Sequence, residues 1–313
     1  MLSQDVLAPP AKAAIFLTVT VRVGQEAAVR QALADVPGLT RAVAFRIPEL
    51  RLSCVVGIGA DLWDRTYEGR RPNGLHPFVP LDGGKHQAVA TAGDLLFHIR
   101  ADRADACFEL SHQLLLRLEG VVDCVEEVHG FRYWDERDLL GFVDGTESPS
   151  IIDEASAAAL IDTQEPRFAG GSYVIVQKYL HDLHAWDALP VEQQEMVIGR
   201  RKLSDIELPD RVKPANSHVA LNTIADEDGN DLAIVRDNLP FGNAGAGEFG
   251  TYFIGYAADP GVTERMLRNM FIGDPVGTYD RILDFSRAVT GCLFFVPPVA
   301  FLEDPEPYLA DSQ

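Results

Sequence analysis

The sequence is poor in basic residues and in long apolar runs. Lys and Arg total 27 against 47 Asp and Glu, which gives the 313-residue chain a formal net charge of −20. Such an acidic surface repels phosphate backbones and anionic lipids, so neither nucleic acid nor a membrane is an expected partner. No apolar run reaches the roughly 18 residues that a membrane-spanning helix needs. The first apolar stretch has no basic flank ahead of it, and it is predicted to be a strand instead of a secretory signal.

Cysteine is also scarce: the four residues Cys54, Cys107, Cys124 and Cys292 lie far apart, each in an apolar segment. The chain has no Cys-x-x-Cys spacing and no cluster of cysteine with histidine. These absences exclude the usual signatures of structural zinc, iron–sulfur clusters and covalently attached c-type haem. Scattered cysteines are typical of small core residues in a reducing compartment, so we expect a cytoplasmic protein.

The apolar sequence that is present suffices for a large core, with 47% hydrophobic and 24% charged residues. In outline, the first half predicts strands and helices close to the order strand, helix, two strands, helix and strand of a ferredoxin-like unit. Its strand candidates are 14–23, 39–47, 52–59, 94–101 and 121–134. Its helix candidates are 25–36 and 103–118.

The second half repeats this theme. Its strand candidates are 171–181, 232–241, 250–257 and 291–298. Its helix candidates are 190–200, 261–273 and 279–289. The sequence therefore predicts an α+β fold of two ferredoxin-like units, residues 1–145 and 146–313, with antiparallel β-sheets and peripheral helices. The polar stretch 147–171 between them is predicted to be a long surface connection.

The run GFVDGTESP, residues 141–149, lies where the two predicted units meet. Asp and Gly favour turns, so a simple chain reversal is one interpretation. In the other interpretation, Gly141 and Gly145 let the backbone approach a flat or bulky ligand while Asp144 points at it. Ligand sites favour junctions between units, which adds weight to the second interpretation.

Three further segments carry candidate site residues. His218 precedes an apolar run, and on local grounds it is either a structural side chain or a ligand. Arg236 and Asn238 alternate on a predicted strand and share one face, where Arg236 is solvated, paired with a carboxylate or lining a pocket. Asp280 and Asp284 lie four residues apart on a predicted helix, either as solvated carboxylates or facing a shared histidine or arginine.

The ordered series of these segments resembles the dye-decolourising peroxidase (DyP) family, and within it the bacterial cytoplasmic B-type branch. The resemblance extends from about residue 50 to about residue 300 and rests on GFVDGTESP, NSHVALN, IVRDNLPFG, GEFGTYFIGYAADP and YDRILDFSRAVTGCLFFVPP. It implies that the C-terminal unit holds a non-covalent haem b. Members commonly have Asn where this chain has Ser148, so a local difference in hydrogen bonding is expected.

On one side of the haem, the resemblance implies that His218 is the proximal ligand of the iron. Either Asp280 or Asp284 would accept the hydrogen bond of the other imidazole nitrogen, which orients the ring. The resemblance leaves the choice between these two carboxylates open.

On the other side, the resemblance implies that Asp144 carries protons between the two oxygens of the peroxide. Arg236 would stabilise the negative charge that develops as the O–O bond splits, or pair with a haem propionate, and Asn238 would hold peroxide or water. The other expected haem contacts are Gly145, Thr146 and Phe253.

The implied activity is that of a peroxidase, which uses hydrogen peroxide to oxidise dyes and small phenolic or aromatic reductants through an oxoferryl intermediate. Haem handling, meaning carriage of porphyrin or removal of its iron, is the alternative. Electrons from bulky dyes would enter through surface aromatic residues, with Trp134, Trp186, Tyr179 and Tyr256 as candidates.

Three smaller expectations complete the interpretation. The pair His181 and His184 beside Trp186 is expected to be exposed. A homo-oligomer is expected by analogy with the family. The acidic segment 303–313 has no apolar docking stretch, so we predict no encapsulin-type targeting tail and no packaging in a protein nanocompartment.

Overall fold

The N-terminal half has the strand–helix order that its sequence predicts. The structure is a computed structural model that describes residues 2–146, 148–149 and 151–309. The main elements of this half are β1 (Ala13–Val21), α1 (Glu26–Ala44), β2 (Ser53–Gly59), β5 (Leu95–Ala101), α3 (Ala104–Arg117) and β6 (Val122–Phe131). The four strands pair antiparallel in the order β2-β5-β1-β6. This is the βαββαβ arrangement of a ferredoxin-like unit.

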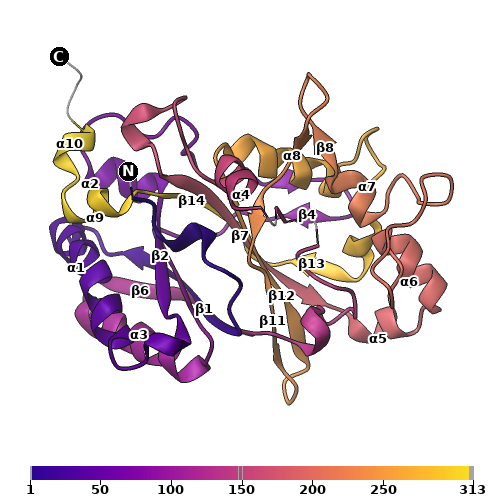
Figure 1. Cartoon of the computed structure of the whole chain (residues 1–313), viewed down its shortest axis with the longest axis horizontal. Coiled ribbons are helices and arrows are strands. Elements are labelled where there is room, and N and C mark those ends of the chain that lie inside the picture. The colour runs from indigo at the N-terminus through magenta and orange to yellow at the C-terminus, as the bar shows by residue number, and fades with distance from the viewer. Residues whose placement is uncertain (1, 147, 150, 310–313) are drawn as a thin grey trace.

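The C-terminal half adds its own antiparallel strands to the same sheet. These are β7 (Ser172–His181), β10 (Val235–Arg236), β11 (Leu239–Asn243), β12 (Glu248–Ala257), β13 (Ser286–Ala288) and β14 (Cys292–Val296). The helices of this half that lie near the site are α4 (Ile152–Ala159), α6 (Val191–Ile198), α7 (His218–Asn222) and α8 (Pro260–Phe271). Figure 1 shows the two halves side by side, with both chain ends on the N-terminal side.

The remaining described elements are short and peripheral. They are the helices α2 (Ala60–Thr66), α5 (Leu183–Asp187), α9 (Val299–Glu303) and α10 (Glu306–Leu309), the strands β3 (Leu81–Asp82), β4 (Gln87–Ala88), β8 (Ile224–Ala225) and β9 (Asp231–Leu232), and the 3₁₀ turns η1 (Asp5–Leu7), η2 (Pro48–Leu50), η3 (Trp134–Glu136), η4 (Pro166–Phe168) and η5 (Arg281–Asp284). No helix in the described part of the chain is long and apolar enough to cross a membrane.

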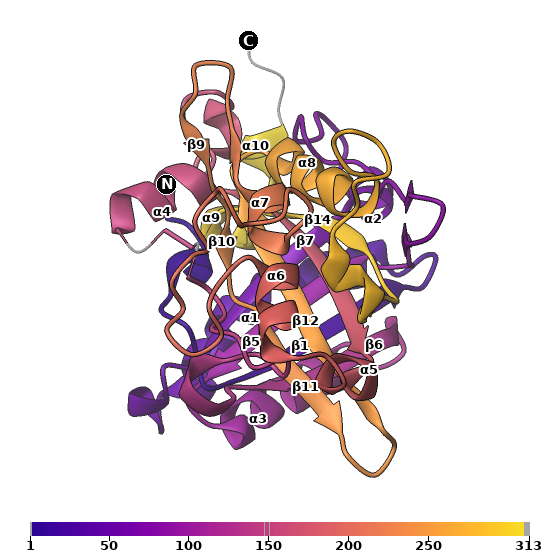
Figure 2. The same cartoon turned by 90° about the vertical axis from the view of Figure 1, so that its right-hand side faces the viewer.

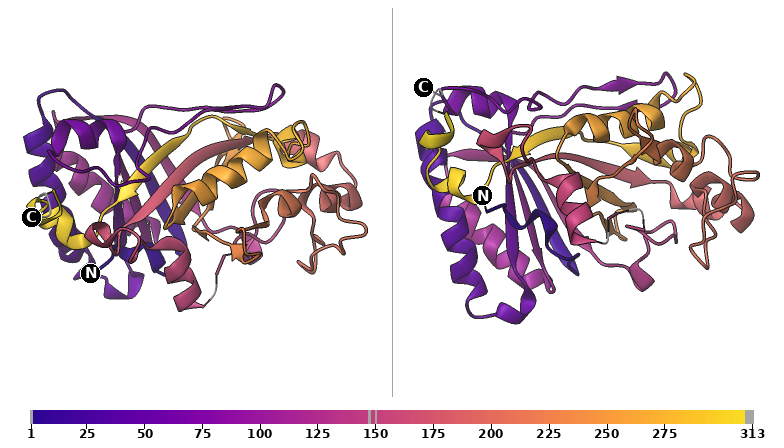
Figure 3. Two further views of the ribbon diagram at one scale, coloured as in Figure 1. Left: turned by 90° about the horizontal axis from the view of Figure 1, so that it is seen from above. Right: turned by 45° about the horizontal axis from the view of Figure 1, so that its top comes forward.

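One continuous sheet joins the halves, because β14 pairs with β7 on one side and with β2 on the other. Strands of both halves bury side chains in a common core that includes Phe16, Val174 and Tyr252. Alternate residues of β7, such as Tyr173 and Tyr179, point to the opposite face, as the period of two requires. Figure 3 shows the indigo and purple helices of the N-terminal half on the outer side of its strands.

Four predicted elements differ from the structure. The strand expected at 232–241 is divided among β9, β10 and β11. The strand expected at 39–47 is largely part of α1, which continues through Pro37 because its buried stripe of Val29, Leu33, Val36 and Leu39 keeps helical spacing. The helix expected at 279–289 is instead η5 followed by β13, which pairs with β7. The surface connection expected at 147–171 contains α4, which buries Ala155 and Ala159. In each case tertiary packing overrides local pattern.

The cysteines are less uniformly buried than expected. All four are free, and Cys107 and Cys292 are buried in the core. Cys54 is half-buried, whereas Cys124 on β6 is exposed. The expectation that cysteine serves only as a core residue is therefore wrong for Cys124.

Candidate active site

A single large cavity lies on the outer face of the C-terminal strands. Its volume is about 1730 Å³, and β7 and β12 form one wall while α4, α7 and α8 form others. Figure 2 views the molecule from the side of α6 and α7. The predicted site residues that line this cavity are Asp144, Gly145, Thr146, His218, Arg236, Asn238 and Phe253. The fold thus gathers residues from segments up to about a hundred positions apart into one chamber.

His218 is the first residue of α7 and is held by a fully buried carboxylate. Ser217 caps the helix by accepting a hydrogen bond from the Ala220 amide at 3.4 Å. Imidazole Nδ1 lies 2.7 Å from Oδ2 of Asp280, whose side chain is 0% exposed. The other carboxylate oxygen accepts a hydrogen bond from the Ile282 amide at 3.0 Å. Nε2 of His218 forms no hydrogen bond with a described residue, so this nitrogen is available as a ligand atom.

Asp284 does not contact His218. Its Oδ1 lies 2.5 Å from Lys85 Nζ, 3.1 Å from His86 Nε2 and 3.2 Å from the Tyr279 hydroxyl. Partial burial opposes ionisation, but the hydrogen bonds from Lys85 and His86 hold the pKa of Asp284 below its ordinary value. The shared helical face expected for Asp280 and Asp284 is wrong, because a 3₁₀ turn has three residues per turn and does not align positions four apart.

The three predicted peroxide-side residues lie on two converging segments. Asn238 donates from Nδ2 to Asp144 Oδ1 at 3.4 Å and accepts from the Ile254 amide at 3.0 Å. The Arg236 amide donates to Ser148 Oγ at 3.3 Å, which is the position where the sequence departs from the family pattern. Among the described residues, the guanidinium of Arg236 has no hydrogen-bond or ion-pair partner, although it lines the cavity. A half-buried cation without a partner is suited to binding an anionic group.

Asp144 is presented by a tight hairpin of residues 137–144. The Asp138 amide donates to the Phe142 carbonyl at 2.8 Å, and Asp138 Oδ1 accepts from the Phe142 amide at 3.0 Å. Leu140 and Phe142 pack in a small core with Trp186, whose Nε1 donates to the Leu140 carbonyl at 2.9 Å. The hairpin is therefore anchored on both its backbone and its apolar side.

The two glycines of this hairpin have different roles. Gly141 has φ of +88°, and a Cβ there would lie 2.6 Å from Lys202 Cε. Gly145 has φ of +84°, and a Cβ there would meet no atom within 4 Å. Both positions require the left-handed conformation that glycine tolerates. Open space is found only at Gly145, so the expected close approach to a ligand fits Gly145 and not Gly141.

Asp138 is a cavity-lining carboxyl that the sequence analysis did not single out. Burial raises the pKa of Asp138 to about 7, and repulsion from Asp144 contributes. The signal available in the sequence was its place six residues before Asp144, in the same turn-rich segment. A carboxyl with a pKa near neutrality beside another carboxyl can hold or release a proton at physiological pH.

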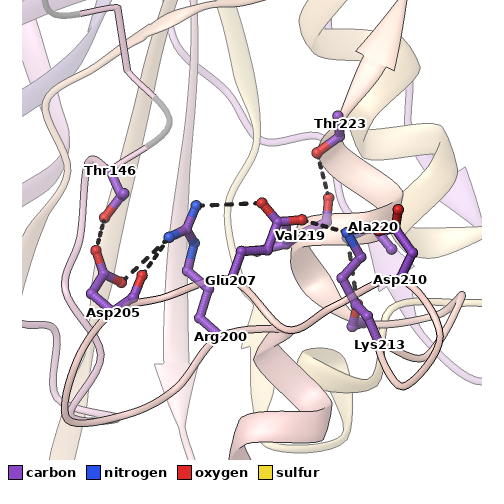
Figure 4. Close-up of polar contacts among 10 residues, drawn as sticks. Thr146, Arg200, Asp205, Glu207, Asp210, Lys213, Val219, Ala220 and Thr223 are labelled. Carbon is purple, nitrogen blue, oxygen red and sulfur yellow. Dashed lines mark hydrogen bonds and ion pairs between the residues drawn. The ribbon is translucent and has the colours of Figure 1, made fainter.

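A set of polar side chains that the sequence did not reveal connects the segment after Asp144 with the segment between α6 and α7. Thr146 Oγ1 donates to Asp205 Oδ2 at 2.8 Å, and Arg200 Nη1 donates to the Asp205 carbonyl at 2.6 Å (Figure 4). Arg200 lies 3.9 Å from Glu207, which in turn pairs with Lys213. Thr146 was predicted to contact a cofactor; it lines the cavity, and its hydroxyl donates to Asp205.

Two further expectations about exposure are wrong in part: His184 is exposed as expected, but His181 is not. His181 lines the cavity, with hydrogen bonds to Thr251 Oγ1 at 3.0 Å and Ser286 Oγ at 2.8 Å, and burial lowers its pKa to about 4. Of the four aromatic residues proposed as surface relays, Trp186, Tyr179 and Tyr256 are buried. Trp134 is 76% exposed and is the member of that set that can meet a bulky molecule at the surface.

Both halves of the chain match family models of one enzyme family. Residues 3–132 match the model described as Dyp-type peroxidase, N-terminal, and residues 135–301 match Dyp-type peroxidase, C-terminal. The dye-decolorizing peroxidase of Mycolicibacterium paratuberculosis is 60% identical, over 97% of this chain and 86% of that protein. The dye-decolorizing peroxidase of Mycobacterium tuberculosis is 58% identical, over 97% of this chain and 90% of its own. A deferrochelatase of Yersinia pseudotuberculosis is only 24% identical.

Solved structures agree with these relationships. The encapsulated DyP-type peroxidase of Mycobacterium smegmatis has a TM-score of 0.95 and 60% identity, covering 97% of this chain and 98% of that one. DyPB of Rhodococcus jostii has a TM-score of 0.94 and 55% identity, covering 96% and 97%. A variant of the R. jostii protein was solved in complex with haem. The present chain therefore belongs to the dye-decolourising peroxidase family and is a peroxidase.

Proposed function

We propose that the cavity holds haem b and that the protein uses hydrogen peroxide to oxidise dyes and small phenolic or aromatic reductants. One observation carries the proposal: one cavity is lined by an imidazole held by a buried carboxylate, an aspartate, an asparagine and an arginine whose guanidinium has no partner among the described residues. These are His218 with Asp280, and Asp144, Arg236 and Asn238. Haem-containing relatives of the same fold support the choice of cofactor.

The residues present fit a haem group. Nε2 of His218 has no partner among the described residues and would bind the iron, while the hydrogen bond from Nδ1 to Asp280 fixes the orientation of the ring. The guanidinium of Arg236 suits a propionate or an anionic reaction partner. Phe253 supplies an aromatic wall, and Gly145 leaves room for close approach. When bound, haem supplies the two-electron reduction of peroxide and the later one-electron oxidation of the reductant.

Proton movement is the work of the protein side chains. Asp144 accepts a proton from one peroxide oxygen and returns it to the departing oxygen, which is general acid–base catalysis. Asn238 orients Asp144 through the 3.4 Å hydrogen bond and keeps its own position through the Ile254 amide. Arg236 stabilises the negative charge that develops on the oxygens. Thr146 lines the cavity and supports the loop through its hydrogen bond to Asp205.

The test is the bimolecular rate constant for hydrogen peroxide, measured by stopped-flow absorption on haem-loaded protein. Loss of acid–base catalysis in Asp144→Asn is expected to lower this constant by about 100-fold or more. Asp123→Asn removes an exposed carboxylate from β6 and serves as the control, with a rate constant like that of the wild type. Equal rate constants for Asp144→Asn and the wild type would contradict the role of Asp144. No reaction of the wild type, with release of metal-free porphyrin, would favour haem handling instead.

Finer features also belong to this proposal. We place the protein in the cytoplasm, as a homo-oligomer, with its two units divided between residues 145 and 146. The free cysteines fit a reducing compartment. The expected absence of a packaging tail concerns 303–313, and residues 310–313 lie outside the described part of the chain. That expectation stays a prediction, and one structural neighbour is an encapsulated peroxidase. Light scattering of the eluting protein tests the oligomer.

A further inference from the structure

A buried ion pair connects the N-terminal half with the segment that carries Arg236 and Asn238. Arg100 lies on β5, and Asp237 lies between β10 and β11. Arg100 Nη1 is 2.5 Å from Asp237 Oδ2, and the two side chains are only 2% and 7% exposed. A second Arg100 nitrogen donates to the Asp5 carbonyl. The two partners are 137 residues apart in the sequence, so the pair is a contact between the two halves.

The pair lies directly behind the cavity wall. Residues alternate along an extended segment, so Asp237 points away from the face shared by Arg236 and Asn238. Arg236 and Asn238 line the cavity, whereas Asp237 does not. Near Asp237, His98 approaches Oδ2 with Nε2 at 3.8 Å and bonds the Tyr256 hydroxyl with Nδ1 at 2.8 Å. The segment is therefore held from its rear by polar side chains in an otherwise apolar core.

The backbone holds the start of this segment over few residues, whereas β11, which follows Asn238, pairs with β12 over five residues. β10 is only two residues long and lies at the end of the strand order, where it pairs with Tyr256 and Gly255 of β12. The next backbone contact, from the Asp237 amide to the Ile254 carbonyl, is long at 3.3 Å. Asn238 then uses its side chain, not its backbone, to bond Ile254. A short edge strand of this kind needs side-chain contacts to fix its position.

The positive charge of Arg100 stabilises the ionised form of the buried Asp237 carboxyl. Burial raises the pKa of Asp237, Arg100 opposes that rise, and the nearby Asp144 adds to it. Removing one partner of a buried ion pair leaves an uncompensated charge that the protein must neutralise or move toward water.

We propose that Arg100 is a positioning residue for the peroxide side of the cavity, since its ion pair with Asp237 fixes the segment that presents Arg236 and Asn238. The inference rests on the proposed function, because its consequence is a slower reaction with peroxide. The ion pair itself depends on Arg100, a residue of the N-terminal half. Without this pair, the segment shifts and Asp237 turns toward the cavity. The hydrogen-bond donors of Arg236 and Asn238 then no longer point at the bound anion or peroxide.

Arg100→Met keeps much of the side-chain volume and removes the charge, and Arg100→Lys retains a charge. The matched control is Arg65→Met, which breaks a partly buried 2.7 Å pair with Asp94 in the same half, away from the cavity. Fluoride binding to the ferric haem-loaded protein is measured by absorption titration, because a bound anion depends on the donors that face it. Peroxide rate constants and haem affinity are measured on the same samples.

Arg100→Met is expected to bind fluoride and to react with peroxide at least about tenfold less well, while its haem affinity stays like that of the wild type. Arg100→Lys is expected to recover part of both losses, and Arg65→Met to show neither. If Arg100→Met binds fluoride like the wild type, or if Arg65→Met loses as much, the proposal is wrong. If only the peroxide reaction of the wild type is missing while the fluoride effect is present, the proposed function fails and this inference stands.

A second variant covers the case in which Arg100→Met does not fold. The double variant Arg100→Met/Asp237→Leu removes both charges, and apolar replacement of a buried pair commonly preserves folding. It is expected to fold and to keep the tenfold loss of fluoride affinity, because the hydrogen-bonded anchor is still missing. Wild-type fluoride affinity in the double variant would overturn the proposal.

Discussion

At the scale of single residues, burial and hydrogen bonding separate two aspartates that the sequence presents as equivalent. Asp280 has no exposed surface and uses one oxygen for His218 Nδ1 and the other for the Ile282 amide. Asp284 is 22% exposed and bonds Lys85. A carboxylate that accepts the hydrogen bond of Nδ1–H makes the imidazole a stronger electron donor to a metal. Asp280 alone is in a position to do so.

This difference predicts the redox behaviour of two matched variants. Asp280→Asn weakens the acceptor for His218, so the midpoint potential of the bound haem iron should rise relative to the wild type. Asp284→Asn should leave that potential unchanged, because Asp284 pairs with Lys85 and His86 instead. Spectroelectrochemical titration measures both. Equal shifts in the two variants would show that the 2.7 Å contact has no electronic role.

At the scale of elements, the hairpin 137–144 combines an anchor and a titrating group. Trp186 and Phe142 hold its apolar side, and Asp138 caps the Phe142 amide from inside the turn. The residue that fixes the hairpin is therefore also the one whose pKa lies near 7. Asp144 is the charged group that raises the pKa of Asp138, and Asp138 in turn acts on Lys202.

The raised pKa of Asp138 predicts a pH-dependent cost to folding. Its folded value of about 7 lies above the ordinary 3.8, so protonation is easier in the folded chain. Stability from the neutral carboxyl is present below about pH 4 and is lost as pH rises toward 7. Asp138→Asn keeps the acceptor for Phe142 and cannot ionise, so its advantage over the wild type should grow by a few kcal/mol across this range. Urea unfolding at several pH values measures it.

The control for this experiment is Asp123→Asn, a change at an exposed carboxylate paired with Arg22. The hydrogen bond from Arg22 holds the pKa of Asp123 below its ordinary value, so its contribution is constant above about pH 4. If the free energies of unfolding of the wild type and Asp138→Asn changed in parallel between pH 4.5 and 7, Asp138 would not carry the raised pKa.

At the scale of the whole molecule, the two halves share one sheet and one core. β14 pairs with both β7 and β2, and the common core places Phe16 of the N-terminal half 4.2 Å, centroid to centroid, from the ring of Tyr252. The Arg100–Asp237 pair crosses the same core. Neither half can keep these contacts after the other unfolds.

The shared core predicts a single cooperative unfolding transition. Trp63 reports on the core that both halves share, where it packs against Tyr67 and Phe301, and Trp186 reports on a separate cluster, because both side chains are almost fully buried. Trp134 is exposed and is replaced by Phe to simplify the signal. Urea unfolding of the Trp63→Phe and Trp186→Phe proteins is followed by fluorescence and by circular dichroism. In each protein the two signals should have the same midpoint. Two separated transitions would show that the halves are independent.

The α+β fold and the membership of the family could be predicted from the sequence, because both depend on local or ordered patterns. Strands such as β2, β5 and β7 have apolar, β-branched runs, and α3 has its buried stripe at helical spacing. The prediction failed at 39–47 and 279–289, where packing decides between helix and strand. The roles of the site residues and the division at residue 145 stay predictions.

The sequence by itself therefore determined the order of elements, the family and the set of residues that could form a site. Only the tertiary structure decided which of them meet: Asp280 and not Asp284 at His218, Asp138 beside Asp144, His181 in the cavity wall, and Arg100 behind Arg236. The physical reason is that local propensity acts over a few residues. Ion pairs and hydrogen bonds between segments 62 or 137 residues apart exist only once the shared core has brought those segments together.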